Sequence, residues 1–134
     1  MISPLVRRLL EVWKYPRADT GNLPQLLADN EHLVLFFPGD PERYPEGDDV
    51  AVILPELLRA FEGRLGAAVV CGENAAALKQ RYPFDAWPGL VFLRRGVQLG
   101  SICKVKDWAD YLEQIEALLG RGTRSEQTIQ SVNL

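Results

Sequence analysis

The chain has 134 residues, of which 47% are hydrophobic and 25% charged, and its formal net charge is -3. This length suits one domain whose core needs no disulfide or metal to stabilise it. Nucleic-acid-binding surfaces need clustered positive charge. The negative net charge and the scattered lysines and arginines therefore argue against a nucleic-acid-binding protein. Two cysteines and one histidine match no zinc-ligand spacing, so neither a metal nor another cofactor is expected.

Apolar residues recur at helical spacing near the amino end, at Val6, Leu9, Leu10 and Trp13. They predict a short amphipathic helix that ends before Pro16. Glu11 and Lys14 interrupt what would be the apolar region of an export signal. We therefore expect a cytoplasmic protein without membrane insertion.

A second short helix is predicted from Asn22, its candidate N-cap, through Leu27. Residues 33–37 form a continuous apolar run, which is typical of a strand buried on both faces. Proline, glycine and charged residues then fill positions 38–47 and predict a surface loop. Asp48 or Asp49 is expected to cap the helix that follows, which contains Pro55 and ends near residue 63.

The second half of the chain predicts a strand at 67–71, a helix at 74–82 and a hairpin of strands 90–93 and 97–103. A last helix is expected to bury one face, which carries Trp108, Leu112, Ile115 and Leu119, and to end at Gly120. This order predicts an α/β fold: a mixed central sheet with helices on both faces. The expected domain covers residues 1–120, with an N-terminal helical extension, and residues 121–134 form a mobile tail.

The stretch from Tyr82 to Leu93 has the spacing that thioredoxins show before and through their cis-proline, and Pro55 resembles their helix-kinking proline. The fold is therefore thioredoxin-like, and Trp87-Pro88 is predicted to be a cis peptide. This resemblance puts the segment Gly47-Asp48-Asp49-Val50 where thioredoxins carry Cys-x-x-Cys, and Phe36 where they bury an aspartate. Without a positioned thiolate there is no disulfide exchange, so we expect a binding protein and not an enzyme.

The remaining candidates for chemistry are two lone cysteines and a histidine. The fold separates Cys71 from Cys103 by two strands, or on the order of 14 Å, which is too far for a disulfide. Both are expected to act as small apolar residues. His32 lies at the start of a strand with no nucleophile nearby, and a structural hydrogen bond is the role expected of it.

Four carboxylates, Glu42, Glu46, Asp48 and Asp49, flank the position of the missing cysteines. They support two interpretations: helix capping together with a solvated loop, or an acidic patch that attracts a basic peptide. Trp87 and Pro88 also have two interpretations. They form the rim of a groove for an extended peptide, or the tryptophan covers the core.

From Leu23 to Leu119 the chain resembles the HyaE/HupG family of hydrogenase expression proteins, most clearly in the segments 36–40, 52–57 and 87–92. The resemblance implies a cytoplasmic maturation chaperone of thioredoxin-like fold that lacks Cys-x-x-Cys. Its partner would be the small-subunit precursor of an uptake [NiFe] hydrogenase, bound with its twin-arginine signal peptide before export. The expected partner-binding residues are those four carboxylates with Trp87 and Pro88. The alternatives are a redox protein that uses one cysteine, and a structural subunit of a larger assembly.

Overall fold

The computed structural model describes residues 2–132, and the side chains of residues 2–121. The helices in that part of the chain are α1 (Pro4–Glu11), α2 (Leu23–Asp29), α3 (Glu46–Ala60), α4 (Asn74–Arg81) and α5 (Trp108–Val132). The strands there are β1 (His32–Phe37), β2 (Gly66–Val69), β3 (Gly89–Arg94) and β4 (Val97–Cys103). All predicted strands are therefore present.

The strands form one mixed sheet in the order β2-β1-β3-β4. The pairing of β1 with β2 is parallel, whereas β3 pairs antiparallel with both β1 and β4. Residues Leu33 to Phe37 of the central strand have no exposed surface, as the apolar run predicted. The α/β fold with a mixed sheet is confirmed.

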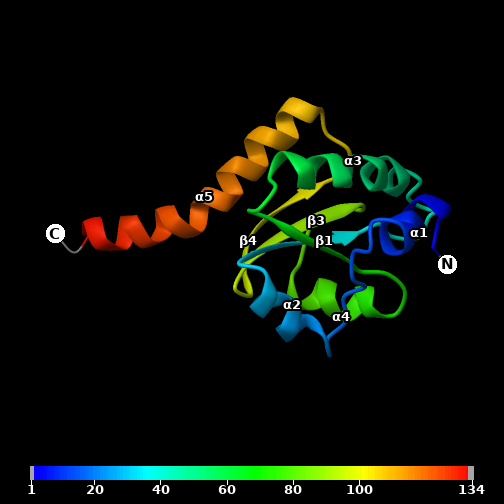
Figure 1. Cartoon of the computed structure of the whole chain (residues 1–134), viewed down its shortest axis with the longest axis horizontal. Helices are drawn as coiled ribbons and strands as arrows, with labels where there is room; N and C mark the ends of the chain where they lie inside the picture. Colours follow the sequence, from blue (N-terminus) through cyan, green and yellow to red (C-terminus); the bar gives the residue numbers. More distant parts are fainter. Residues whose placement is uncertain (1, 133–134) are drawn as a thin grey trace.

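The core lies on both faces of the sheet, because successive side chains of a strand point to opposite faces. On one face Val34 and Phe36 pack with residues of α1, α3 and α5. On the other face Leu33, Leu35 and Phe37 pack with residues of α2 and α4. Figure 1 shows these two helical layers above and below the sheet.

A short extended segment, which the sequence did not predict, lies beside β2. The amide of Val69 donates to the carbonyl of Pro16 at 2.9 Å, and the amide of Ala18 donates to the carbonyl of Val69 at 2.8 Å. Arg17 is thereby paired in parallel with Val69. The segment after α1 covers an edge of the sheet that would otherwise leave backbone groups unpaired.

The predicted cap of α3 is wrong, and that of α2 is right in position only. Helix α3 begins at Glu46, three or four residues earlier than a cap at Asp48 or Asp49 predicts, with Pro45 at the N-cap position and without a side-chain cap. Asp48 and Asp49 therefore lie in its first turn, where their charge still complements the helix dipole. Asn22 occupies the N-cap position of α2, but its side chain accepts from the amide of Asp19 at 2.8 Å instead.

Helix α5 differs from its prediction at both ends. Trp108, expected to be buried, is 45% exposed, because the buried stripe starts one turn later at Tyr111 and continues through Ile115, Leu118 and Leu119. The Tyr111 hydroxyl accepts from the amide of Lys106 at 3.1 Å and donates to the carbonyl of Lys104 at 3.3 Å, which satisfies its polar atom in the core.

The helix also continues past Gly120 to Val132 and leaves the body of the domain (Figure 1). A glycine inside a helix costs only about 1 kcal/mol relative to alanine, so Gly120 does not by itself end the helix. The domain boundary at residue 120 stays a prediction. Among the described helices, α5 included, none combines the length and apolar character needed to span a bilayer.

Candidate functional site

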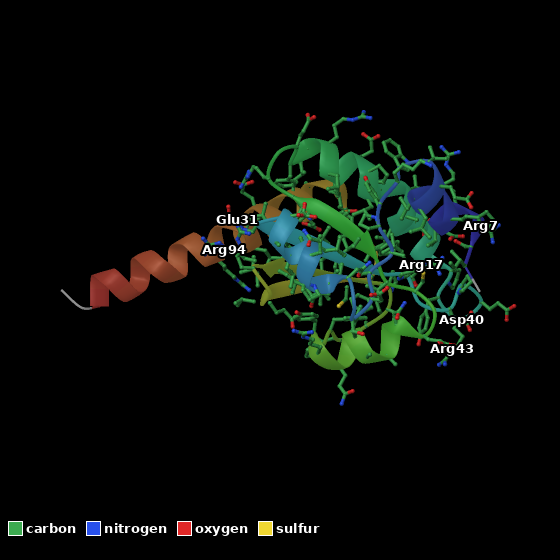
Figure 2. The ribbon with its side chains drawn as sticks, turned by 60° about the horizontal axis from the view of Figure 1, so that its bottom comes forward. Arg7, Arg17, Glu31, Asp40, Arg43 and Arg94 are labelled. Carbon is green, nitrogen blue, oxygen red and sulfur yellow. The ribbon has the colours of Figure 1, made fainter. Side chains whose placement is uncertain are left out.

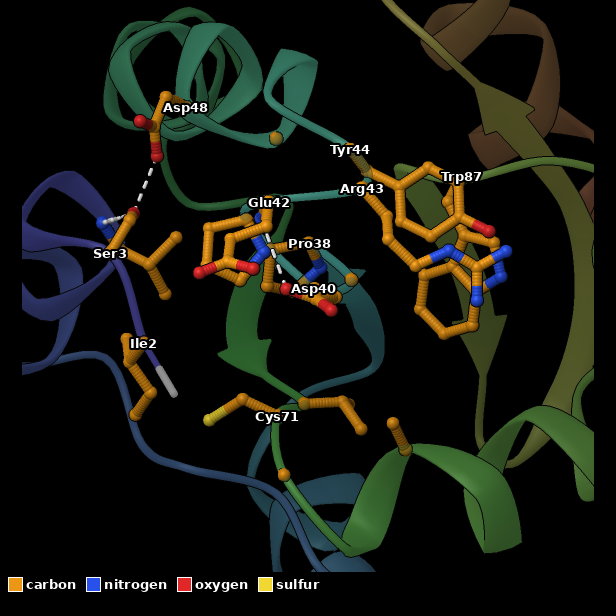
Figure 3. A pocket seen from close by; sticks show the side chains of 17 residues that line it. Ile2, Ser3, Pro38, Asp40, Glu42, Arg43, Tyr44, Asp48, Cys71 and Trp87 are labelled. Carbon is orange, nitrogen blue, oxygen red and sulfur yellow. Dashed lines mark hydrogen bonds between the residues drawn. The ribbon is translucent and has the colours of Figure 1, made fainter.

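A pocket of about 570 Å³ opens beside the start of α3 (Figure 3). Four parts of the chain line it: the N-terminal segment, the loop after β1 with the first turn of α3, the segment after β2, and Trp87. The lining residues are Ile2, Ser3, Val6, Pro38, Gly39, Asp40, Pro41, Glu42, Arg43, Tyr44, Gly47, Asp48, Val70, Cys71, Gly72, Ala75 and Trp87. The pocket therefore occupies the place where the sequence put the lost redox site.

Three of the six predicted site residues line this pocket: Glu42, Asp48 and Trp87. The other three, Glu46, Asp49 and Pro88, are not part of the lining. Successive helical residues point about 100° apart, so when Gly47 and Asp48 face the pocket their neighbours face solvent. Glu46 and Asp49 are accordingly exposed, and Pro88 is buried. Partner binding by these residues stays a prediction.

Asp40, which the sequence analysis did not single out, orders the loop that forms one wall. Its carbonyl accepts from the amides of Arg43 at 3.1 Å and Tyr44 at 2.8 Å. Its carboxylate accepts from the amide of Glu42 at 3.0 Å. A signal for this role was present, since aspartate commonly bonds its own backbone two residues on in turns. The loop is therefore held in one conformation without any ligand.

The same loop sets Tyr44 against Trp87, with ring centroids 5.9 Å apart and an interplanar angle of 25°. Gly39 makes this contact possible. Its φ is +79°, and a Cβ there would lie 2.9 Å from Cδ2 of Tyr44 and 3.0 Å from Cε3 of Trp87. A side chain at position 39 would therefore be strained and would displace the rings.

Trp87 connects the pocket to the core. The centroid of its ring lies 4.9 Å from the ring centroid of Phe84 and 6.2 Å from that of Phe37, and both contacts have edge-to-face geometry. The peptide bond from Trp87 to Pro88 is cis, as predicted. The ring of Trp87 packs against the core and also lines the pocket. The interpretation that it covers the core is therefore confirmed, whereas a groove for an extended peptide stays a prediction.

The opposite side of the pocket is formed by α1. Ser3 caps this helix by accepting from the amide of Val6 at 3.2 Å, and its hydroxyl also donates to Asp48. Val6 and Leu9 anchor α1 in the core, where they are 3% and 1% exposed. The N-terminal extension thus becomes a fixed wall of the pocket, which no thioredoxin-like motif in the sequence indicated.

The two cysteines are free. Cys71 follows β2 and Cys103 lies in β4, so that the strands β1 and β3 lie between them, as predicted. Cys71, just after β2, is buried and lines the pocket. Burial raises the pKa of its thiol, although Arg17 acts in the other direction. The raised pKa favours the protonated form of the thiol. Cys103, on β4, is only half-buried.

The structural hydrogen bond expected of His32 is absent at Nε2, which is buried and has no partner among the described residues. Burial is the main cause that lowers the pKa of this imidazole. The negative charge of Glu31 raises the pKa, whereas the positive charges of Arg94, Arg64 and Arg95 lower it further. His32 lines a second, polar hollow far from the main pocket. Figure 2 shows the two regions at opposite ends of the domain, with Asp40 and Arg43 at one and Glu31 and Arg94 at the other.

Within residues 2–132, no group of three histidine, cysteine, aspartate or glutamate side chains is arranged to hold a metal ion. The acidic and basic side chains in the lining of the main pocket are three carboxylates, Asp40, Glu42 and Asp48, and one cation, Arg43. Such a lining can bind charged groups of either sign.

Comparison with solved structures supports the fold. The chain is similar to Plasmodium falciparum thioredoxin with a TM-score of 0.61 at 12% identity, covering 75% of this chain and 94% of that one. It is also similar to a hydrogenase expression/formation protein, hupG, from Rhodopseudomonas palustris. In that comparison the TM-score is 0.58 at 39% identity, over 81% of this chain and 97% of the other. The thioredoxin-like fold is thereby confirmed.

The sequence comparisons identify the family. Residues 5–111 match the family described as Hydrogenase-1 expression protein HyaE. The hydrogenase expression/formation protein HoxO of Azotobacter vinelandii is 47% identical over 119 residues, which cover 89% of this chain and 80% of the relative. The HupG protein of Rhizobium leguminosarum bv. viciae is 44% identical over 123 residues, which cover 89% and 83%. This chain belongs to the HyaE family of hydrogenase expression proteins.

Proposed function

We propose that this chain is a non-catalytic maturation chaperone. It acts in the cytoplasm, where it binds the small-subunit precursor of an uptake [NiFe] hydrogenase, with its twin-arginine signal peptide, before export. The family membership supports a role in hydrogenase formation. The proposal extends that role to a particular partner and to a particular surface, the pocket beside α3.

The observation that carries this proposal is the set of carboxylates in an ordered pocket with apolar walls. Glu42 and Asp48 line the pocket together with Ile2, Pro38 and Trp87. An extended peptide with arginines would place its guanidinium groups near the carboxylates and its apolar side chains on those walls. Because Asp40 already holds the loop, binding would cost little further ordering of the protein.

The start of α3 supports the absence of catalysis. A Cβ on Gly47 would lie 2.8 Å from the carbonyl oxygen of Pro38, so a cysteine at this position requires the backbone to move. Val50, at the position of the second cysteine, is 1% exposed and belongs to the core. Phe36 is fully buried where a proton-transferring aspartate would lie. Gly47, Val50 and Phe36 therefore supply none of the thiol and carboxyl groups that a dithiol site uses, which supports the non-catalytic proposal.

This absence predicts that the protein reduces no disulfides. In an insulin reduction assay with dithiothreitol, the rate with the protein should equal the rate in buffer, because no thiolate is positioned to attack. A thioredoxin serves as the positive control. Turnover above buffer that is lost in Cys71→Ser would overturn the non-catalytic assignment.

One observation favours a second candidate, a redox function through a single cysteine, because Cys71 lines the pocket. Its buried and protonated thiol argues against that function. Alkylation of a Cys103→Ser variant, in which Cys71 is the remaining thiol, distinguishes the non-catalytic function from the redox function. We expect Cys71 to react with iodoacetamide only after unfolding, whereas rapid reaction in the native protein would favour the redox candidate.

The direct test of the proposal is co-purification with the hydrogenase small-subunit precursor, expressed with and without its signal peptide. We expect the full precursor to be retained and the form without signal peptide to be lost. Equal retention of both forms would contradict binding through the signal peptide. Retention of neither would contradict the proposed partner.

A further inference from the structure

The aromatic side of the pocket carries one cation, Arg43, whose guanidinium carbon lies 5.5 Å from the ring centroid of Tyr44. Tyr44 in turn stacks on Trp87, and both rings line the pocket. A second cation, the ammonium of Lys79 on α4, lies 4.7 Å from the centroid of Phe84 and 5.9 Å from that of Trp87, but Lys79 is not part of the lining.

Neither Arg43 nor Lys79 forms an ion pair with a described carboxylate. Among the side chains of residues 2–121, the ion pairs are those of Arg59 with Glu56, Arg64 with Glu116 and Arg94 with Glu31. Arg43 and Lys79 make ring contacts and take no part in them. A cation that is held in position but lacks a carboxylate partner is suited to receive one from another molecule.

The charges of opposite sign are separated across the pocket. In Figure 3, Arg43, Tyr44 and Trp87 form one side, Asp48 and Ser3 form the opposite side, and Asp40 and Glu42 lie between them. A segment that carries only basic residues would be attracted to one side and repelled from the other. The pocket is therefore complementary to a segment that carries charges of both signs.

We propose that Arg43 binds an acidic side chain of the partner segment, so that the segment lies in one direction, with its basic residues toward Glu42 and Asp48. This inference rests on the proposed function and adds a second recognition element to it. The Tyr44 ring beside Arg43 would shield one side of the pair from water and strengthen it relative to a fully exposed pair.

The test is the effect of Arg43→Glu on the affinity for the full precursor, measured by isothermal titration calorimetry. If the pocket recognises only basic residues, a further negative charge at position 43 should tighten binding. If Arg43 holds an acidic side chain, the same change should weaken binding by about fivefold, in the range of a partly exposed charge pair. Lys79→Glu, at a residue outside the lining, should change the affinity less than Arg43→Glu does.

A matched control is Arg81→Glu. The guanidinium carbon of Arg81 also lies 5.5 Å from a tyrosine ring, that of Tyr82, but Arg81 is not part of the pocket lining. This variant makes the same charge change, and its affinity should equal that of the parent. Melting temperatures of all three variants report whether folding is preserved.

A precursor variant completes the test. Replacing the acidic residue of the bound segment with lysine should restore the affinity of the Arg43→Glu protein. Tighter or unchanged binding by Arg43→Glu would overturn this inference and leave the proposed function intact. Failure of the parent protein to bind the precursor would overturn both.

Discussion

At the scale of single residues, Gly39 is the position on which the shape of the pocket depends most. Gly39→Ala places a Cβ within 3.0 Å of Trp87 and strains a backbone with φ of +79°. We expect a loss of about 2–4 kcal/mol in the free energy of unfolding by urea, from backbone strain together with overpacking.

Gly63 offers a matched control for this prediction. It has a similar φ of +80°, yet a Cβ there would meet nothing within 4 Å. Gly63→Ala should therefore show only the backbone cost, about 1–2 kcal/mol. Equal losses for the two variants would mean that Tyr44 and Trp87 can move apart freely, and that the pocket wall is not fixed by this contact.

His32 should make stability depend on pH. Burial lowers the pKa of His32 in the folded protein below the ordinary value. At pH values between this lowered pKa and the ordinary one, the unfolded chain therefore binds more protons than the folded protein does. The free energy of unfolding therefore rises as pH increases through that window and falls as pH decreases from about 7 to about 6. His32→Gln should flatten this fall in urea titrations, and an unchanged slope would show that other groups cause it.

At the scale of elements, the junction of α1 with α3 depends on Ser3. Ser3→Ala removes the cap of α1 and leaves Asp48 without its hydroxyl donor. We expect a loss of about 1–2 kcal/mol in thermal or urea unfolding. Ser101→Ala is the control, since the Ser101 hydroxyl lies 4.0 Å from the sulfur of Cys103 and makes no shorter contact of this kind. A loss no larger than that of the control would refute the role of Ser3.

Most elements could be predicted because they follow from patterns that are local in the sequence. The apolar runs of β1 and β3 and the turn at Arg94 to Gly96 contain their own signals. The pairing of Pro16 and Ala18 with Val69 could not be predicted, since it joins residues about fifty positions apart through backbone atoms. The start of α3 was misplaced because a favourable cap residue was preferred over proline, whose fixed φ also suits a first turn.

The site was predicted in part for a related reason. Glu42, Asp48 and Trp87 were found because they lie near positions that a thioredoxin-like motif marks. Ile2, Ser3 and Cys71 come from distant parts of the chain, and only tertiary packing brings them to the pocket. The cation Arg43 carries no sequence signal of its own, because its proposed role arises from the ring of Tyr44 beside it and from the carboxylates across the pocket.

At the scale of the whole molecule, a thioredoxin-like body has a binding pocket where a thioredoxin has its dithiol. The net charge of -3 favours the approach of a basic partner, and the three pocket carboxylates concentrate that charge at one place. The N-terminal extension adds a wall to the pocket and the ordered loop adds another. These changes together put a pocket with charged and apolar walls at the position of a redox site, which is what the proposed binding function requires.

The measurement that tests this account most directly is the affinity of the precursor signal peptide for the parent protein, Glu42→Lys and Glu62→Lys at two salt concentrations. Glu42 lines the pocket, whereas Glu62 is exposed outside it and makes the same charge change. We predict that Glu42→Lys weakens binding about fivefold at low salt and that Glu62→Lys leaves it unchanged. Raising the ionic strength to about 0.5 M should weaken parent binding by screening. Equal affinities for all three proteins, without salt dependence, would contradict recognition by the pocket carboxylates.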